Sequence, residues 1–345
     1  MPKIAYSAVY EELCRRIEGR MLQPGQLMPP ENKLAEKYEI SRTTARKVLQ
    51  MLADKGLIVS KAGVCWAVLR STPNPDGHKR QLTIGVDSIL PDWGFYYHKH
   101  LMQGISDAAQ RTNCRLEMVD VNDVENLSRR NIDGMLIMWG RDEFFPNYAE
   151  LAESGKPVVM INRQPPSRRI STFSVDYTQE ARRAVEYLLL CGHRDIALVG
   201  GGYSPSMEQR QNGFYQAFAA RNLPVPEHLI WHDLNVDVLS GMLKKHRPTA
   251  AFFLFGILIP TFVIASERVG MRIPDDISIL CFDDMSDNPV SDFPISCIRM
   301  PLYQMGEAAL LHTVQRIEKP ETRVCSRIFG ADLCINSSCR YHKEI

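Results

Sequence analysis

From residue 82 onward, short apolar runs rich in β-forming residues alternate with helical stretches, and this alternation restricts the fold more than any other feature. Alternating strands and helices are typical of parallel sheets connected by crossover helices. The chain has 345 residues, more than the roughly 250–300 at which a single core stops growing. We therefore expect an α/β fold with two doubly wound lobes. The expected strands are 82–87, 115–120, 134–139, 157–161, 172–176, 195–200, 249–254 and 277–282.

The first part of the chain has a different pattern, three helical segments followed by a hairpin. The helices are expected at 6–19, after Pro30, and after Ser41, which is a favourable N-cap. Two short β-rich runs follow at 57–59 and 65–68. This order of elements predicts a winged helix-turn-helix.

The formal net charge of +1 conceals an uneven distribution. Residues 1–80 contain 14 Lys and Arg against 8 Asp and Glu, whereas the remaining residues contain 27 against 32. This asymmetry is typical of a small nucleic-acid-binding domain joined to a domain that does not bind nucleic acid. We expect domains at 1–70 and 82–345 with a polar linker at 71–81. The salt dependence of DNA binding should then come from Lys and Arg of residues 1–80 only.

The third expected helix begins with a polar and cationic turn, and its apolar face starts only at Val48. The first residues of a recognition helix reach base edges while the rest of the helix packs. Arg pairs bidentately with guanine, and Thr contacts phosphate or a thymine methyl group. In isolation this run would favour a solvated helix face over a DNA contact. Within a basic winged helix we expect DNA contacts from Arg42, Thr43, Thr44, Arg46 and Lys47.

The run PGQLMPPENKLAEKYEISRTTARKVLQMLADKGLIVSKAG, at 24–63, resembles the DNA-binding domain of the GntR family. The resemblance covers residues 5–69. It implies that Arg42, Thr43, Thr44 and Arg46 contact DNA and that Gly63 lies at the tip of the wing. The sequence departs from the family pattern in two places. Asn32 stands where the family often has Arg, and Cys65 followed by Trp66 replaces the second wing glycine.

The rest of the chain resembles the effector domain of the LacI family, which is shaped like a periplasmic sugar-binding protein. The motifs follow in order over nearly all of 82–340: IGV, IDGMLI, KPVVMINR, SVDY, CGHRDIALVGG, RQNGF, RIPDDISILCFDD and MGEAA. A GntR-type domain on a LacI-type domain is the architecture of the arabinose-repressor subgroup. The resemblance implies three crossovers between a lobe of 82–171 with about 300–322 and a lobe of 172–299 with 323–340.

The LacI resemblance also implies an effector site beyond the carboxyl ends of the strands, where ligands bind in such sheets. Asp283, Arg210 and Asn162 match positions that contact effector in the family. A sugar site also needs an apolar or aromatic platform for the ring face. Candidates for that platform are the aromatic residues of the loop expected after the first strand, Trp93, Tyr96 and Tyr97.

Two alternatives remain open at this site. Asp283 and Arg210 would equally suit an interlobe ion pair that binds no ligand, and the aromatic residues would suit packing or a partner surface. Phe255-Gly256 stands where the family usually has Asn-Asp. The pocket therefore has fewer side chains that can form hydrogen bonds with a ligand. We expect it to hold a less hydroxylated ligand or no effector at all.

The sequence contains no motif that would support catalysis or a bound cofactor. Gly200-Gly201-Gly202 lacks the Gly-Lys-Ser/Thr ending of a phosphate-binding loop, and GxSxG and HExxH are absent. Asp283 and Asp284 are adjacent at a strand end and should point to opposite faces, so they do not form an acid–base pair. We expect no catalytic residue, no cofactor and no metal.

The nine cysteines include no CxxC pair and are interpreted as reduced and mostly buried.

Residues 250–265 form the most apolar stretch, but it is shorter than the roughly 18–20 residues of a membrane span and contains Pro260. A buried strand followed by a buried helix explains it better. The N-terminal residues have no signal-peptide pattern, so we expect a cytoplasmic protein that does not contact membranes.

These features together predict a sequence-specific DNA-binding transcriptional regulator, more specifically a repressor. We expect it to bind pseudo-palindromic operator DNA as a homodimer and to be controlled by a small-molecule effector, a carbohydrate or a compound derived from one. The alternative is a DNA-binding regulator whose degenerate pocket binds no ligand.

Overall fold

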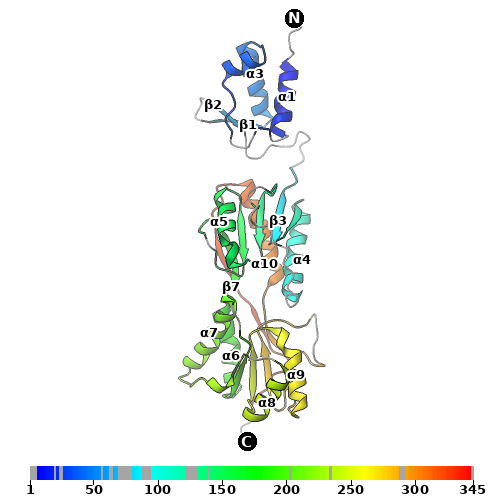
Figure 1. The fold of residues 1–345 in the computed structure, drawn as a ribbon, viewed down its shortest axis with the longest axis vertical. Coiled ribbons are helices and arrows are strands. Elements are labelled where there is room, and N and C mark those ends of the chain that lie inside the picture. Colours follow the sequence, from blue (N-terminus) through cyan, green and yellow to red (C-terminus); the bar gives the residue numbers. More distant parts are fainter. Residues whose placement is uncertain are drawn as a thin grey trace. The chain divides into compact units, whose positions relative to one another are not determined.

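The computed structural model describes residues 6–342 with gaps, and its contacts divide the chain into a unit of residues 1–81 and a unit of residues 82–345 (Figure 1). The gaps fall at 19–20, 23–25, 56, 62–64, 69–79, 88–94, 121–126, 128–129, 139, 166, 202–203, 233–234 and 287–291. Each unit is described by itself.

The first unit is a winged helix. Its elements are α1 (Tyr6–Glu18), α2 (Glu31–Lys37), α3 (Arg42–Asp54), β1 (Ile58–Lys61) and β2 (Cys65–Val68). The two strands pair antiparallel, and one core joins the three helices to the hairpin. The predicted order of elements is confirmed.

The first lobe of the larger unit contains a six-stranded sheet in which every strand pair is parallel. Helices α4 and α10 pack against each other and α10 contacts the sheet, while α5 packs with a separate apolar cluster. The strand order is β13-β7-β6-β5-β3-β4. The elements are β3 (Thr83–Asp87), α4 (Phe95–Arg111), β4 (Arg115–Val119), β5 (Gly134–Ile137), α5 (Phe145–Glu153), β6 (Val158–Ile161), β7 (Ser171–Val175), α10 (Leu302–Glu318) and β13 (Ser326–Phe329).

The second lobe also contains a six-stranded sheet, in which only the β12–β14 pair is antiparallel. Helices α6 and α7 pack together, as do α8 and α9. The strand order is β14-β12-β11-β10-β8-β9. The elements are α6 (Tyr177–Leu190), β8 (Ile196–Val199), α7 (Pro205–Ala219), β9 (Ile230–Trp231), α8 (Val236–His246), β10 (Ala250–Phe253), α9 (Ile259–Arg268), β11 (Ser278–Cys281), β12 (Ser296–Arg299) and β14 (Asp332–Cys334).

The chain crosses between the lobes three times, but two of the crossovers lie later in the sequence than expected. The strand at 172–176 was placed in the second lobe, yet β7 pairs with β6 in the first sheet. The segment 323–340 was placed wholly in the second lobe, yet β13 pairs with β7 and only β14 joins the second sheet. A buried parallel strand is apolar in either sheet, so composition alone does not assign it to a lobe.

The apolar stretch 250–265 folds as β10, a 3-10 turn and most of α9, as predicted for a buried strand followed by a helix. No described helix is both long and apolar enough to cross a membrane.

Helices α4 and α10 approach each other closely at two glycines. A Cβ atom on Gly306 would lie 2.2 Å from the carbonyl oxygen of Leu101, and one on Gly104 would lie 2.0 Å from that of Tyr303. Both obstacles are backbone atoms, which do not move aside as a flexible side chain does. The two glycines therefore set the distance between these helices.

We expect Gly306→Ala to destabilise the larger unit by about 1–3 kcal/mol, because the added methyl group forces α4 and α10 apart. Urea unfolding followed by circular dichroism measures this change. The matched control is Gly241→Ala on α8, where nothing lies within 4 Å of the new Cβ atom. That variant should gain about 0.5–1 kcal/mol. A loss of the same size in both variants would contradict the close-approach explanation.

Candidate DNA-binding and effector sites

The first turn of α3 presents the polar residues that the sequence singled out. The Ser41 hydroxyl accepts a hydrogen bond from the backbone N–H of Thr44 at 3.1 Å, which confirms the predicted N-cap. Arg42, Thr43, Arg46 and Lys47 are exposed, and Thr44 is half-buried. The opposite face of the helix is buried against the core of the domain, through Ala45, Val48, Leu49 and Leu52.

Two of these cations already have partners within the domain. The guanidinium of Arg46 donates two hydrogen bonds to the Glu31 carboxylate, at 2.9 and 3.0 Å. This hydrogen bonding lowers the pKa of Glu31 and raises that of Arg46. The Lys47 ammonium lies 4.7 Å from the centre of the Tyr6 ring.

Within the described residues, Arg42 forms no ion pair, so its guanidinium is the cation of this turn most available to DNA. Gly63, expected at the tip of the wing, lies outside the described residues.

In the first lobe, Tyr97 and Asn162 form one hydrogen-bonded group. The Asn162 amide donates to the Tyr97 hydroxyl at 3.0 Å, and its oxygen accepts from the N–H of Val175 at 3.3 Å. Burial raises the pKa of Tyr97 well above its ordinary value, while the positive charge of Arg210 acts in the opposite direction. Tyr97 also packs against an apolar cluster whose members come from both lobes.

Tyr96 and Tyr97 lie in the first turn of α4, not in the loop expected after the first strand. The helix begins at Phe95, within the segment that was expected to be a loop. Tyr96 lies 4.5 Å from the His100 ring, between ring centres, and packs at the margin of the core. Trp93 lies outside the described residues.

Arg210 is the buried cation of the second lobe, with 5% of its surface exposed. Its guanidinium carbon lies 4.0 Å from the centre of the Phe282 ring and 4.9 Å from that of Tyr177. Its Nη1 donates to the carbonyl oxygen of Leu254 and lies 3.5 Å from an Asp283 carboxylate oxygen. Its Nε atom is buried and has no hydrogen-bond partner among the described residues.

Asp283 completes this group from the end of β11. Its second carboxylate oxygen accepts the N–H of Gly256 at 3.1 Å, which anchors the segment after β10. Arg210 and Asp283 therefore do pair, but both belong to the second lobe, so the alternative of an interlobe ion pair is wrong. Phe255 packs against two apolar clusters, one within the second lobe and one that also includes residues of the first lobe, instead of presenting a polar group.

The neighbouring carboxylates Asp283 and Asp284 have separate partners, in agreement with the prediction that they point to opposite faces. Asp284 is buried, accepts the N–H of Ser286 at 2.8 Å and pairs with Arg299. Burial opposes ionisation of this carboxyl, but the hydrogen bonds to Ser286 and Arg299 outweigh it and lower the pKa of Asp284.

The sequence reasoning missed Tyr177 and Phe282 as members of this group. Both belong to motifs that carried the family resemblance, SVDY and CFDD. Aromatic residues at or next to the ends of expected strands were the sequence feature that could have identified them. The arrangement supplies a guanidinium, a carboxylate, an amide and a phenol hydroxyl, which suits binding of a small polar molecule. Among the described residues, no group of three or more His, Cys, Asp or Glu could hold a metal ion.

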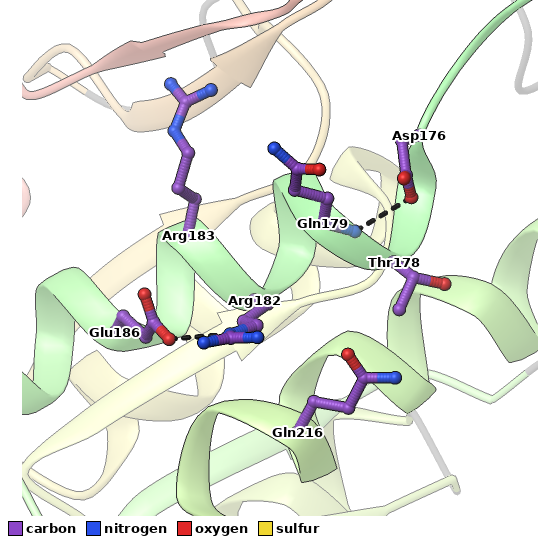
Figure 2. Close-up of a pocket in the computed structure, with 7 residues that line it drawn as sticks. All are labelled: Asp176, Thr178, Gln179, Arg182, Arg183, Glu186 and Gln216. Carbon is purple, nitrogen blue, oxygen red and sulfur yellow. Dashed lines mark hydrogen bonds and ion pairs between the residues drawn. The ribbon is translucent and has the colours of Figure 1, made fainter. Parts of the chain in front are cut away.

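A cavity of about 450 Å³ lies elsewhere, on the solvent side of α6 and α7 (Figure 2). Two of its lining residues, Arg182 and Glu186, pair one turn apart on α6 at 2.6 Å, and Arg183 pairs with Glu180. The charges of this cavity are thus largely neutralised internally, and its walls offer no aromatic platform. Its lining is Asp176, Thr178, Gln179, Arg182, Arg183, Glu186 and Gln216.

The fold and these sites define a class: a winged-helix DNA-binding domain joined to a two-lobed binding domain. Residues 5–68 match the family model described as bacterial regulatory proteins, gntR family. Residues 185–339 match the model of the periplasmic binding protein-like domain. The chain is therefore a transcriptional regulator with a GntR-family DNA-binding domain and a periplasmic-binding-protein-like domain.

Individual relatives agree with this assignment. The chain is 25% identical to the arabinose metabolism transcriptional repressor of Geobacillus stearothermophilus, over 99% of this chain and 98% of that protein. It is 26% identical to the HTH-type transcriptional repressor CytR of Escherichia coli K12, over 78% and 83%.

The solved structures support the fold. The complex of the transcriptional regulator CelR with cellobiose has a TM-score of 0.65, at 19% identity, over 90% of this chain and 100% of that chain. A LacI family regulator from Enterococcus faecium with bound ribose has a TM-score of 0.66, at 22% identity, over 76% and 100%.

We expect Asp284 to make the stability of the larger unit depend on pH. Its pKa is lowered on folding, so its contribution is present above the unfolded value of about 3.9 and is lost as the pH falls through the folded value. Asp284→Asn should cost on the order of 1–3 kcal/mol at pH 7, and its stability should change less with acid. Urea unfolding at a series of pH values measures both effects.

Asp237→Asn is the matched control. The side chain of Asp237 is 89% exposed and pairs with Arg268 on the surface, so its loss should change stability little. An equal loss of stability in both variants at pH 7 would contradict the role of the buried pair.

Proposed function

We propose that the protein is a repressor that binds pseudo-palindromic operator DNA as a homodimer. The observation that carries this proposal is the exposed cationic first turn of α3, within a domain that matches the GntR family. A dimer with two-fold symmetry presents two such helices, which requires two half-sites in the DNA. The named relatives that are repressors support the direction of regulation.

The second part of the proposal concerns control by a small polar ligand, a sugar or a sugar derivative. Its support is the group formed by Arg210, Asp283, Asn162 and Tyr97, together with relatives solved with cellobiose and ribose. A ligand that binds one arrangement of the lobes better than the other shifts the equilibrium between them by that difference in affinity. The linker at 71–81 would pass this change to the DNA-binding domains.

Phe255 favours a second candidate, a regulator whose pocket no longer binds a ligand. An apolar ring replaces the expected amide at the end of β10 and packs into the core. In that case the group around Arg210 is purely structural, and DNA binding is constitutive.

We expect Arg42→Ala to weaken operator binding by about 1–3 kcal/mol, roughly 5- to 150-fold, because a guanidinium that pairs with a base edge is lost. Gel shift with DNA upstream of the protein's own gene and of its neighbours measures this change. Gln50→Ala is the control, since Gln50 is exposed on the same helix and its side-chain amide donates to the Asp54 carboxylate. If Arg42→Ala binds as tightly as Gln50→Ala, α3 is not the recognition helix.

We expect one member of a panel of sugars and sugar acids to raise the thermal midpoint of the larger unit. A ligand at 100 times its Kd stabilises by about 2.7 kcal/mol. Asp283→Ala should abolish this shift, whereas Gln216→Ala, in the surface cavity of Figure 2, should retain it. Absence of a shift with every compound, while operator binding persists, would support the ligand-blind candidate.

A further inference from the structure

The parallel strands of the first lobe place all their amino ends at one edge of the sheet. The chain enters the lobe at this edge, since Arg80 lies directly ahead of β3. The carboxyl end of α10 also lies here, because residues 319–325 lead from it into the amino end of β13. Two segments far apart in the sequence, 167–170 and 316–325, therefore meet at this edge.

These two segments carry five cations. Thr172 of β7 is the register partner of Ser326 of β13. Arg169 and Arg323 each lie three residues before one member of this pair, in the segments that lead into the two strands. Arg316 joins them, because its Nη1 donates to the carbonyl oxygen of Arg169 at 3.5 Å. We call the whole set the arginine edge: Arg168, Arg169, Arg316, Lys319 and Arg323.

The arginine edge has an excess of positive charge on a unit that is acidic overall. The same segments contain two carboxylates, Glu318 and Glu321, which leaves a net charge of +3. Arg168, Arg169, Lys319 and Arg323 are exposed, and within the described part of the chain none of them forms an ion pair. Exposed guanidinium groups without carboxylate partners suit the binding of phosphate.

The position of the arginine edge along the chain indicates which phosphate it meets. From Val68, at the end of the winged helix, to Arg80 there are only twelve residues, which span at most about 43 Å when fully extended. The DNA-binding domain is thus joined to this edge by a short tether, and the DNA that it would bind carries one negative charge per roughly 1.7 Å of its axis.

We propose that the arginine edge binds the phosphate backbone of the same DNA that the winged helix holds. This inference rests on the proposed DNA-binding function and extends it to the larger unit. It replaces the expectation from net charge that only Lys and Arg of residues 1–80 contribute to the salt dependence of binding.

The test measures the affinity of the full chain for a duplex of about 40 base pairs at a series of salt concentrations. Each phosphate contact contributes about 0.9 to the slope of log K against log salt concentration. The double variant Arg169→Gln/Arg323→Gln should therefore lower the slope by about 1.8 for each bound protomer, about 3.6 for the homodimer, and weaken binding at every salt concentration in the series. Because this electrostatic contribution does not depend on sequence, a duplex of arbitrary sequence serves as the probe.

The control removes the same charge from the second lobe. Arg221 and Lys244 are both exposed there, and Arg221→Gln/Lys244→Gln should leave the slope unchanged. An unchanged slope in Arg169→Gln/Arg323→Gln, or an equal fall in the control, would overturn the proposal that the arginine edge binds DNA, but not the DNA-binding function of the winged helix. Failure of the unmodified chain to bind any duplex would overturn the DNA-binding function as well.

Discussion

Parallel pairing of strands is the constraint on which the larger unit depends. It aligns the six strands of the first sheet, so that their amino ends share one edge and their carboxyl ends share the other. The amino edge receives the chain from the DNA-binding domain and carries the arginine edge. The carboxyl ends lead to the first crossover, at β7 and α6, and to the group formed by Tyr97 and Asn162. One topological rule therefore separates a surface suited to DNA from a site suited to a small molecule.

Burial of Arg210 in the candidate effector site carries a free-energy penalty and leaves a hydrogen-bond donor for a ligand. A buried cation is expensive unless it is paired and hydrogen-bonded. Here a backbone carbonyl, a carboxylate at 3.5 Å and two aromatic rings compensate for the lost water. The compensation is incomplete, because the Nε atom has no partner among the described residues. A ligand with an acceptor oxygen would supply the missing partner, whereas a ligand-free site must tolerate the loss.

The sequence predicted the features that depend on local chemistry. Ser41 caps α3 because a short hydroxyl side chain satisfies a free N–H, and the eight expected strands all occur. Features that depend on distant pairing were not predictable: β9 and β14 have only two and three residues, β13 is mostly exposed, and the lobe of β7 is decided by its neighbours. The same division between local and distant features applies to the site residues. Asp283 and Arg210 were identified by motif, but the contact of Arg210 with Tyr177 and Phe282 required the fold.

The strand order also has a consequence for biosynthesis. The first sheet is completed by β13 and the second by β14, and both strands lie within residues 326–334. The winged helix, by contrast, ends its last strand at Val68. Since domains fold as they emerge during synthesis, the DNA-binding domain can fold early, while both lobes must wait for the end of the chain. A ribosome that stalls before residue 326 would leave a finished DNA-binding domain without the domain that regulates it.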